Sequence, residues 1–249
     1  MTDSTSIIQE TMRAVLLTSI LLCTVAAHAQ LDDIFKKATD ALNQRNTASL
    51  SNDKIVSGLK EALQVSTGKA VAYTGRPDGF LKNAAIKILL PPKLQTVGKG
   101  MRLIGMGQQV DDLEVGMNRA AEQATPQAKQ IFIAAVKRMS FDDARKILTG
   151  SDTAATEYFK QASTEDLTTA FSPIVARSMQ RVGVVQQYNR VLSNAPGGTA
   201  LTGQFDLNKY VVGQTLNGLF LMLGEEEKKI RKDPAAQTTA LLKEVFGRK

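Results

Sequence analysis

The sequence predicts an all-α protein: a single multi-helix, bundle-like domain with at most a very short extended segment near 86–90. Two observations support this fold class. From Leu31 onward, apolar residues recur at three- and four-residue spacing for most of the chain, which is the period of an amphipathic helix. Residues that commonly cap helices also precede several of these segments. The domain is expected to span residues 30–249.

The first residues have the pattern of a secretory signal peptide, which we expect over 1–29. An apolar stretch at 14–27 ends in the small-residue triplet Ala-His-Ala at 27–29, as in a cleavable leader. The stretch is shorter than the roughly 20 residues of a membrane-spanning helix. Met12 is the expected true start, because Arg13 follows it and no Lys or Arg precedes it. We therefore expect secretion, into the periplasm, with no transmembrane segment after processing.

Helices follow one another along the rest of the chain, and four of them have recognisable start signals. Two signals place a capping side chain before a proline suited to the first helical turn, and two resemble capping boxes with Asp in place of Glu. The signals are Thr125-Pro126, Ser140–Asp143, Ser163–Asp166 and Asp233-Pro234. The expected helices cover 31–46, 51–72, 93–106, 109–124, 126–139, 141–149, 152–162, 164–192, 206–231 and 234–246.

Three segments interrupt the helical pattern. Residues 76–79 read Arg-Pro-Asp-Gly, which is typical of a turn. Residues 86–88 alternate in polarity before Pro91 and Pro92, so a short extended piece is expected there. Residues 194–203 contain Pro-Gly-Gly and are expected to form a flexible loop.

The composition excludes several kinds of chemistry. The one cysteine, Cys23, and the one histidine, His28, both lie in the expected leader. Thiol nucleophiles, histidine triads and histidine zinc sites are thereby excluded from the mature chain, and we expect no metal and no cofactor. Leu22 before Cys23 is a poor fit to the lipoprotein alternative. The net charge of +7 is spread along the chain, which favours a solvated surface or weak attraction to anionic envelope components over nucleic-acid binding.

One polar stripe stands out on the helix expected at 109–124. Glu114, Asn118 and Glu122 are spaced by four residues, so they lie on one helix face. Arg119 is three residues before Glu122 and is placed to form an ion pair with it.

A second charged group ends the helix expected at 206–231, which is apolar on nearly all sides and is therefore expected in the core. There Glu227 and Arg231 form a favourable i, i+4 pair, within reach of the first stripe if the two helices pack. Three interpretations remain: a buried ion network that fixes helix register, a ligand-binding or catalytic site, or a solvated face. The candidate binding residues are Glu114, Asn118, Arg119, Glu122, Glu227 and Arg231.

Seven stretches carry a resemblance to a known family. They are 58–63, 78–80 (Asp-Gly-Phe), 88–91 (Ile-Leu-Leu-Pro), 117–124 (which begins Met-Asn-Arg-Ala-Ala-Glu), 139–144, 154–159 and 226–234. Together they resemble the bacterial family called domain of unknown function 4197. The resemblance implies a helical protein secreted to the envelope of Gram-negative bacteria. It implies no activity, cofactor or catalytic residue.

Three functions are compatible with the sequence. The first is a non-catalytic binding or interaction module, whose partner is an anionic envelope component or another periplasmic protein. The second is a carboxylate enzyme acting on cell-wall glycan, with Glu61, Glu114 and Glu122 as candidates. The third is a carrier of an apolar ligand, with a cavity lined by Met101, Met106 or Met222.

Overall fold

The structure, a computed structural model, describes residues 52–181, 183–194, 206–237 and 243. The expected leader at 1–29, the helix expected at 31–46 and almost all of the loop expected at 194–203 lie outside these residues. The described part is 83% helical and contains no strand. This confirms the all-α class.

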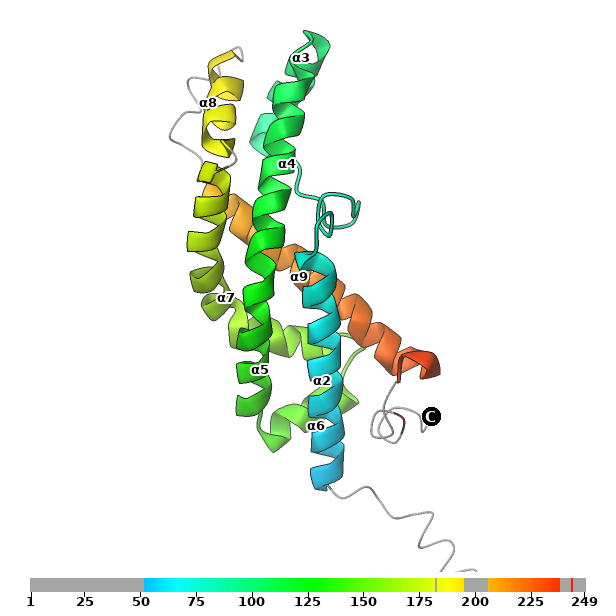
Figure 1. Cartoon of the computed structure of the whole chain (residues 1–249). Helices are drawn as coiled ribbons and strands as arrows, with labels where there is room; N and C mark the ends of the chain where they lie inside the picture. Colours follow the sequence, from blue (N-terminus) through cyan, green and yellow to red (C-terminus); the bar gives the residue numbers. More distant parts are fainter. Residues whose placement is uncertain (1–51, 182, 195–205, 238–242, 244–249) are drawn as a thin grey trace, which may run out of the picture. The chain divides into compact units, whose positions relative to one another are not determined.

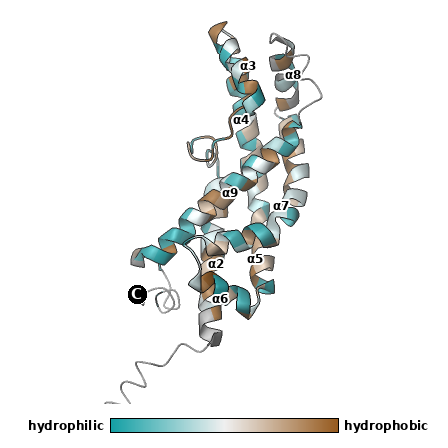
Figure 2. Cartoon of the chain, turned by 180° about the vertical axis from the view of Figure 1, so that it is seen from behind, coloured by the Kyte–Doolittle hydropathy of each residue, from teal (hydrophilic) through white to brown (hydrophobic). Residues whose placement is uncertain are grey.

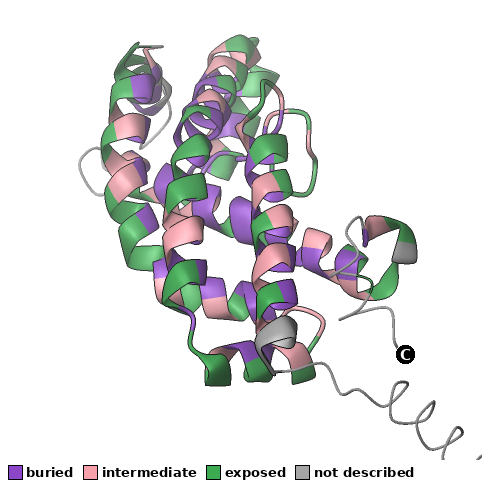
Figure 3. Ribbon diagram, turned by 60° about the horizontal axis from the view of Figure 1, so that its bottom comes forward, coloured by how far each residue is buried: buried purple, intermediate pink, exposed green. Residues whose placement is uncertain are grey.

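Figure 1 shows α2, α4, α5 and α7 lying beside one another, while α9 crosses them and packs against α2, α4 and α7. The α-helices are α2 (Asn52–Gly75), α3 (Pro92–Leu103), α4 (Gly107–Ala124), α5 (Ala128–Arg138), α6 (Phe141–Thr149), α7 (Ala154–Arg181), α8 (Val184–Asn194) and α9 (Leu207–Lys232), and short 3-10 helices occupy Thr125–Gln127 and Pro234–Ala236. The helices present buried faces to one another and exposed faces to solvent (Figure 3).

The predicted start signals have mixed outcomes. Ser140 forms a complete capping box with Asp143 at the start of α6, as predicted. Thr125 does not cap a helix, because its hydroxyl donates to the Ala121 carbonyl and the 3-10 turn leads directly from α4 into α5. Asp233 accepts a hydrogen bond from the Ala235 amide, and Pro234–Ala236 form a short 3-10 turn. Most of the rest of the helix expected at 234–246 lies outside the described residues.

The capping box predicted at Ser163 is wrong. Residues 154–181 form one helix, α7, and the Ser163 hydroxyl donates to the Phe159 carbonyl one turn earlier. A serine inside a helix commonly makes this bond instead of a cap. The break expected at 163 lies instead near Gly183, whose φ of +71° favours glycine. Pro173 lies within α7, which bends along its length (Figure 1).

The connection between α2 and α3, residues 76–91, has no helix or strand, yet several of its side chains belong to the core. The Gly79 amide donates to the Arg76 carbonyl, which confirms the predicted turn. Further on, Ile86, Ile88 and Leu90 are buried and the residues between them are exposed. This is the alternation of an extended chain, although the described residues contain no strand that pairs with it.

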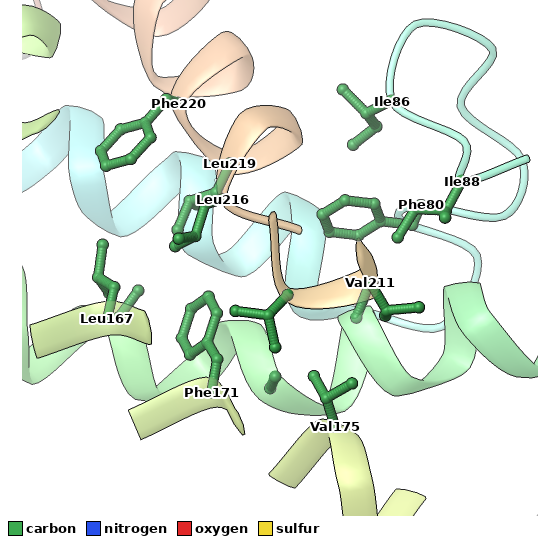
Figure 4. Close-up of a cluster of buried hydrophobic side chains, with 14 of the residues drawn as sticks. Phe80, Ile86, Ile88, Leu167, Phe171, Val175, Val211, Leu216, Leu219 and Phe220 are labelled. Atoms are coloured by element: carbon green, nitrogen blue, oxygen red, sulfur yellow. The ribbon is translucent and has the colours of Figure 1, made fainter. Parts of the chain in front are cut away.

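Phe80 anchors this connection to the core. Figure 4 shows its ring, with Ile86 and Ile88, directed toward the side chains of α9 and α7. Gly218 of α9 leaves the necessary room, since a Cβ at this position would lie 2.6 Å from Cε1 of Phe80. The connection therefore packs against α9 through its side chains.

Candidate functional site

Asn118 of α4 is fully buried and binds the backbone of the 76–91 connection as a neighbouring strand would. Its side-chain oxygen accepts from the Ile88 amide at 2.9 Å, and its side-chain nitrogen donates to the Ile88 carbonyl at 2.8 Å. The same nitrogen donates to the Glu114 carbonyl at 2.8 Å. One amide side chain thus satisfies both backbone groups of the buried residue Ile88. Leaving those two groups buried without hydrogen bonds would destabilise the fold.

The two glutamates of the stripe extend this arrangement in both directions. Oε1 of Glu122 accepts from the amides of Phe80 and Leu81, each at 3.1 Å. One turn beyond Asn118, Oε1 of Glu114 accepts from the Leu90 amide at 3.2 Å. The stripe predicted on one helix face therefore exists, and its three side chains hold five backbone groups, four N–H and one C=O, of the connection.

Arg119 ties the same connection to α4 through charge. Its guanidinium donates to Oε2 of Glu122 at 2.7 Å, as predicted, and to Oδ1 of Asp78 at 2.6 Å. Lys82 forms a second ion pair with Asp78 at 2.8 Å. Hydrogen bonds from Lys82 and then Arg119 lower the pKa of Asp78, and the bonds to Glu122 and Asp78 raise the pKa of Arg119.

Glu227 and Arg231 of α9 lie at the junction of α6 and α7. The carboxylate of Glu227 accepts from the amides of Ala155 and Thr156, both at 2.9 Å, and from the Thr156 hydroxyl at 2.8 Å. These amides belong to the first turn of α7, where N–H groups lack partners within the helix and a negative charge is favourable. Arg231 donates to Glu227 and to the Ile147 carbonyl near the end of α6.

The six predicted residues therefore form two clusters. Glu114, Asn118, Arg119 and Glu122 hold the connection between α2 and α3, and Glu227 with Arg231 holds the junction between α6 and α7. In both clusters the partners are mainly backbone groups far away in the sequence. The sequence pattern predicted the side chains that share a face, and it gave no signal for these backbone partners.

Several members of the clusters were not predicted as site residues. Asp78 was expected only as part of a turn, and the structure adds a φ of +66° there and an ion pair with Arg119. Thr156 was not singled out, although its hydroxyl and amide both bind Glu227. Tyr210 of α9 donates to the Leu89 carbonyl at 3.0 Å, and burial, followed by the nearby charge of Glu114, raises its pKa.

Two open clefts lie beside these clusters. One, of about 340 Å³, is lined by Gly75, Pro77, Arg119, Glu122, Gln123 and Pro126. The other, of about 230 Å³, lies between the start of α7 and the middle of α9 and includes Asn217, Lys160 and Lys228. No methionine lines either cleft, and Met101 packs in the core.

Two further properties concern the residues that the structure describes. No helix in this part of the chain combines the length and apolar character needed to cross a membrane. The same residues contain no group of three or more His, Cys, Asp or Glu side chains that could hold a metal ion.

Comparison with known proteins identifies the family but no individual relative. No curated protein and no solved structure matches the chain. The model of the family described as "Protein of unknown function (DUF4197)" matches residues 49–247, which include the connection between α2 and α3 and every residue of both clusters. Since this match covers most of the sequence, the chain belongs to the DUF4197 family.

Proposed function

We propose that this chain is a non-catalytic binding or interaction protein of the bacterial cell envelope, exported through a cleavable signal peptide. The leader pattern at 1–29 supports the location. The observation that carries the non-catalytic role is that Glu114, Glu122 and Glu227 are all engaged by N–H donors that hold the fold together.

The alternative, a carboxylate enzyme acting on glycan, needs a different environment. A glycosidase acid must present a proton to the leaving oxygen, usually opposite a second carboxylate across the substrate. In Glu122, Oε1 accepts from two amides and Oε2 accepts from Arg119. Because an ionised carboxylate only accepts hydrogen bonds, this set of donors suits a structural anion and opposes a proton donor.

Purified cell-wall glycan provides the direct test. We expect the wild-type protein to release no soluble fragments above a buffer control, and Glu61→Gln, Glu114→Gln and Glu122→Gln to behave identically. Glu61 is included because it is only half-buried on α2. Fragment release by the wild type that any of these substitutions abolishes would refute the non-catalytic role.

Two further measurements test the binding role and the location. N-terminal mass spectrometry of protein from its host should find Gln30 as the first residue, and a chain that retains Met1 or Met12 would contradict export by cleavage. Native mass spectrometry of the same material should show a retained lipid, glycan or protein partner. Repeated recovery of the bare chain would count against a binding protein.

A further inference from the structure

The end of α3 and the turn after it carry the two most exposed large apolar side chains among the described residues. Leu103 is 88% exposed and Ile104 is 65% exposed. Residues 102–105, the last two residues of α3 and the two residues of the turn that follows, lie at the end of the helical unit remote from α6 (Figure 1), where the ribbon is coloured hydrophobic in Figure 2. We call these four residues the α3–α4 apex.

The apex is a defined structure. The Ile104 amide donates to the Gly100 carbonyl at 3.3 Å, and the Met106 amide donates to the Met101 carbonyl at 2.9 Å. Gly105 has a φ of +82°, which lets the chain reverse into α4. Backbone hydrogen bonds from three successive amides, those of residues 104–106, therefore fix the turn that exposes the two apolar side chains.

Folding does not require these side chains. Helix α3 buries Leu94 and Met101 against the core, while the apex lies beyond the last buried turn. A single exposed leucine is ordinary in a protein surface. Leu103 and Ile104 are adjacent and lie at the end of a helical hairpin, where polar residues would serve equally well. Two such neighbouring apolar side chains indicate a surface that contacts something apolar.

The charges of α3 restrict what that contact can be. All three charged residues of this helix, Lys93, Lys99 and Arg102, are basic and exposed. Arg102 forms an ion pair with Asp111 of α4 at 2.6 Å. Among the ion pairs of the described residues, none involves Lys93 or Lys99. Lys99 lies one turn before Leu103, so its ammonium group is available beside the apolar tip, whereas Lys93 is at the start of the helix, about 15 Å away along its axis.

We infer that the α3–α4 apex inserts Leu103 and Ile104 into the interfacial layer of an anionic lipid bilayer, while Lys99, one turn before Leu103, meets the phosphates of the head groups. This inference rests on the proposed envelope binding role and names its partner. Apolar tips combined with basic side chains suit such surfaces. A stable protein interface buries about 800 Å² on each partner, far more than two side chains on a convex tip supply.

The absence of tryptophan from the chain makes a site-specific test possible. Leu103→Trp places a single fluorophore at the apex, and Leu221→Trp, on a 45% exposed residue of α9, is the matched control. Each protein, purified from its host, is mixed with vesicles of equal parts phosphatidylglycerol and phosphatidylcholine. We expect a blue shift, and quenching by brominated lipid, for Leu103→Trp alone.

Two substitutions, one in the apex and one a turn earlier in α3, separate the apolar and basic contributions. Ile104→Asp should lower the vesicle partition coefficient at least about tenfold, because burial of one aliphatic side chain is lost. Lys99→Glu should lower it about fivefold or more, as expected when a cation near an anionic surface is removed. Vesicles of phosphatidylcholine alone should bind more weakly than the mixed vesicles. Circular dichroism verifies that each variant keeps its helical content.

Three results would overturn the inference: no blue shift at position 103, an equal shift at position 221, or unchanged partitioning of Ile104→Asp. If a host protein in place of vesicles shields the tryptophan at 103, the lipid assignment is wrong while the binding role remains. Fragment release from cell-wall glycan would instead refute the binding role without moving the vesicle measurements. The two failures are therefore distinguishable.

Discussion

Replacing Asn118 with Asp should destabilise the protein strongly, although the two side chains have nearly the same shape. The aspartate keeps an oxygen facing the Ile88 amide. It replaces the nitrogen that donates to the carbonyls of Ile88 and Glu114, each at 2.8 Å, with a second oxygen. The site is fully buried, so water cannot substitute for the lost donor.

The magnitude follows from the groups left without partners. A buried polar group that loses its partner costs about 1–3 kcal/mol, and two carbonyls are affected, so the free energy of unfolding should fall by about 2–6 kcal/mol. Protonation of the aspartate would restore one donor and place the loss near the lower end of this range. Even that is a large part of the roughly 5–15 kcal/mol typical of a folded domain.

Urea unfolding followed by far-ultraviolet circular dichroism measures this loss. Asn217→Asp makes the same chemical change at an exposed position of α9 and should shift the free energy of unfolding by no more than about 0.5 kcal/mol. Hydrogen exchange should also become faster at the Ile88 amide. Equal stability of Asn118→Asp and wild type, with unchanged exchange at Ile88, would refute the role assigned to this side chain.

Three other predictions test the packing and the charges. Gly218→Ala should lower the free energy of unfolding by roughly 1–3 kcal/mol, because the new Cβ would lie 2.6 Å from the Phe80 ring. Gly213→Ala in the same helix meets nothing within 4 Å and should raise the free energy of unfolding by up to about 1 kcal/mol. The melting temperatures of the two variants should therefore shift in opposite directions. Glu227→Ala should lower the free energy of unfolding, measured in urea, by about 3–5 kcal/mol, because a buried ion pair loses one partner. A change below roughly 1 kcal/mol, which is what an exposed ion pair contributes, would contradict this. The pKa of Asp78 is lowered in the folded state. The stability that this carboxylate contributes is therefore fully present above its unfolded pKa of about 3.9 and is lost as the pH falls through the lowered folded pKa. Asp78→Asn should differ from wild type in free energy of unfolding at neutral pH, and the two should converge when stability is measured at increasingly acid pH.

Helix positions were predictable where local chemistry and packing agree. Ser140 stands between two helices, and its capping box matches the observed start of α6. Ser163 has an equivalent motif, but Phe159 and Leu167, one turn to either side, are both fully buried. The core contacts of these two side chains keep the helix continuous through the motif, and tertiary packing overrides the local preference.

The candidate site was predictable only in part, for a related reason. A spacing of four residues is enough to place Glu114, Asn118 and Glu122 on one face. The backbone groups that they bind belong to an irregular segment, where no periodic pattern marks which amide turns inward. For Glu227, the i, i+4 partner could be predicted, whereas the start of α7, about 70 residues earlier in the sequence, could not.

The position of Phe80 against Gly218 has a consequence for the order in which the molecule is completed. A chain emerging from the ribosome contains the phenylalanine long before the glycine, since α9 is the last α-helix of the described part. Until that helix is present, the Phe80 ring lacks the packing surface around Gly218, and the first turn of α7 lacks the carboxylate of Glu227. The same late helix supplies both partners, so the final packing of the earlier helices is complete only once α9 has docked. Docking of α9 is thus the step that closes the described part of the fold.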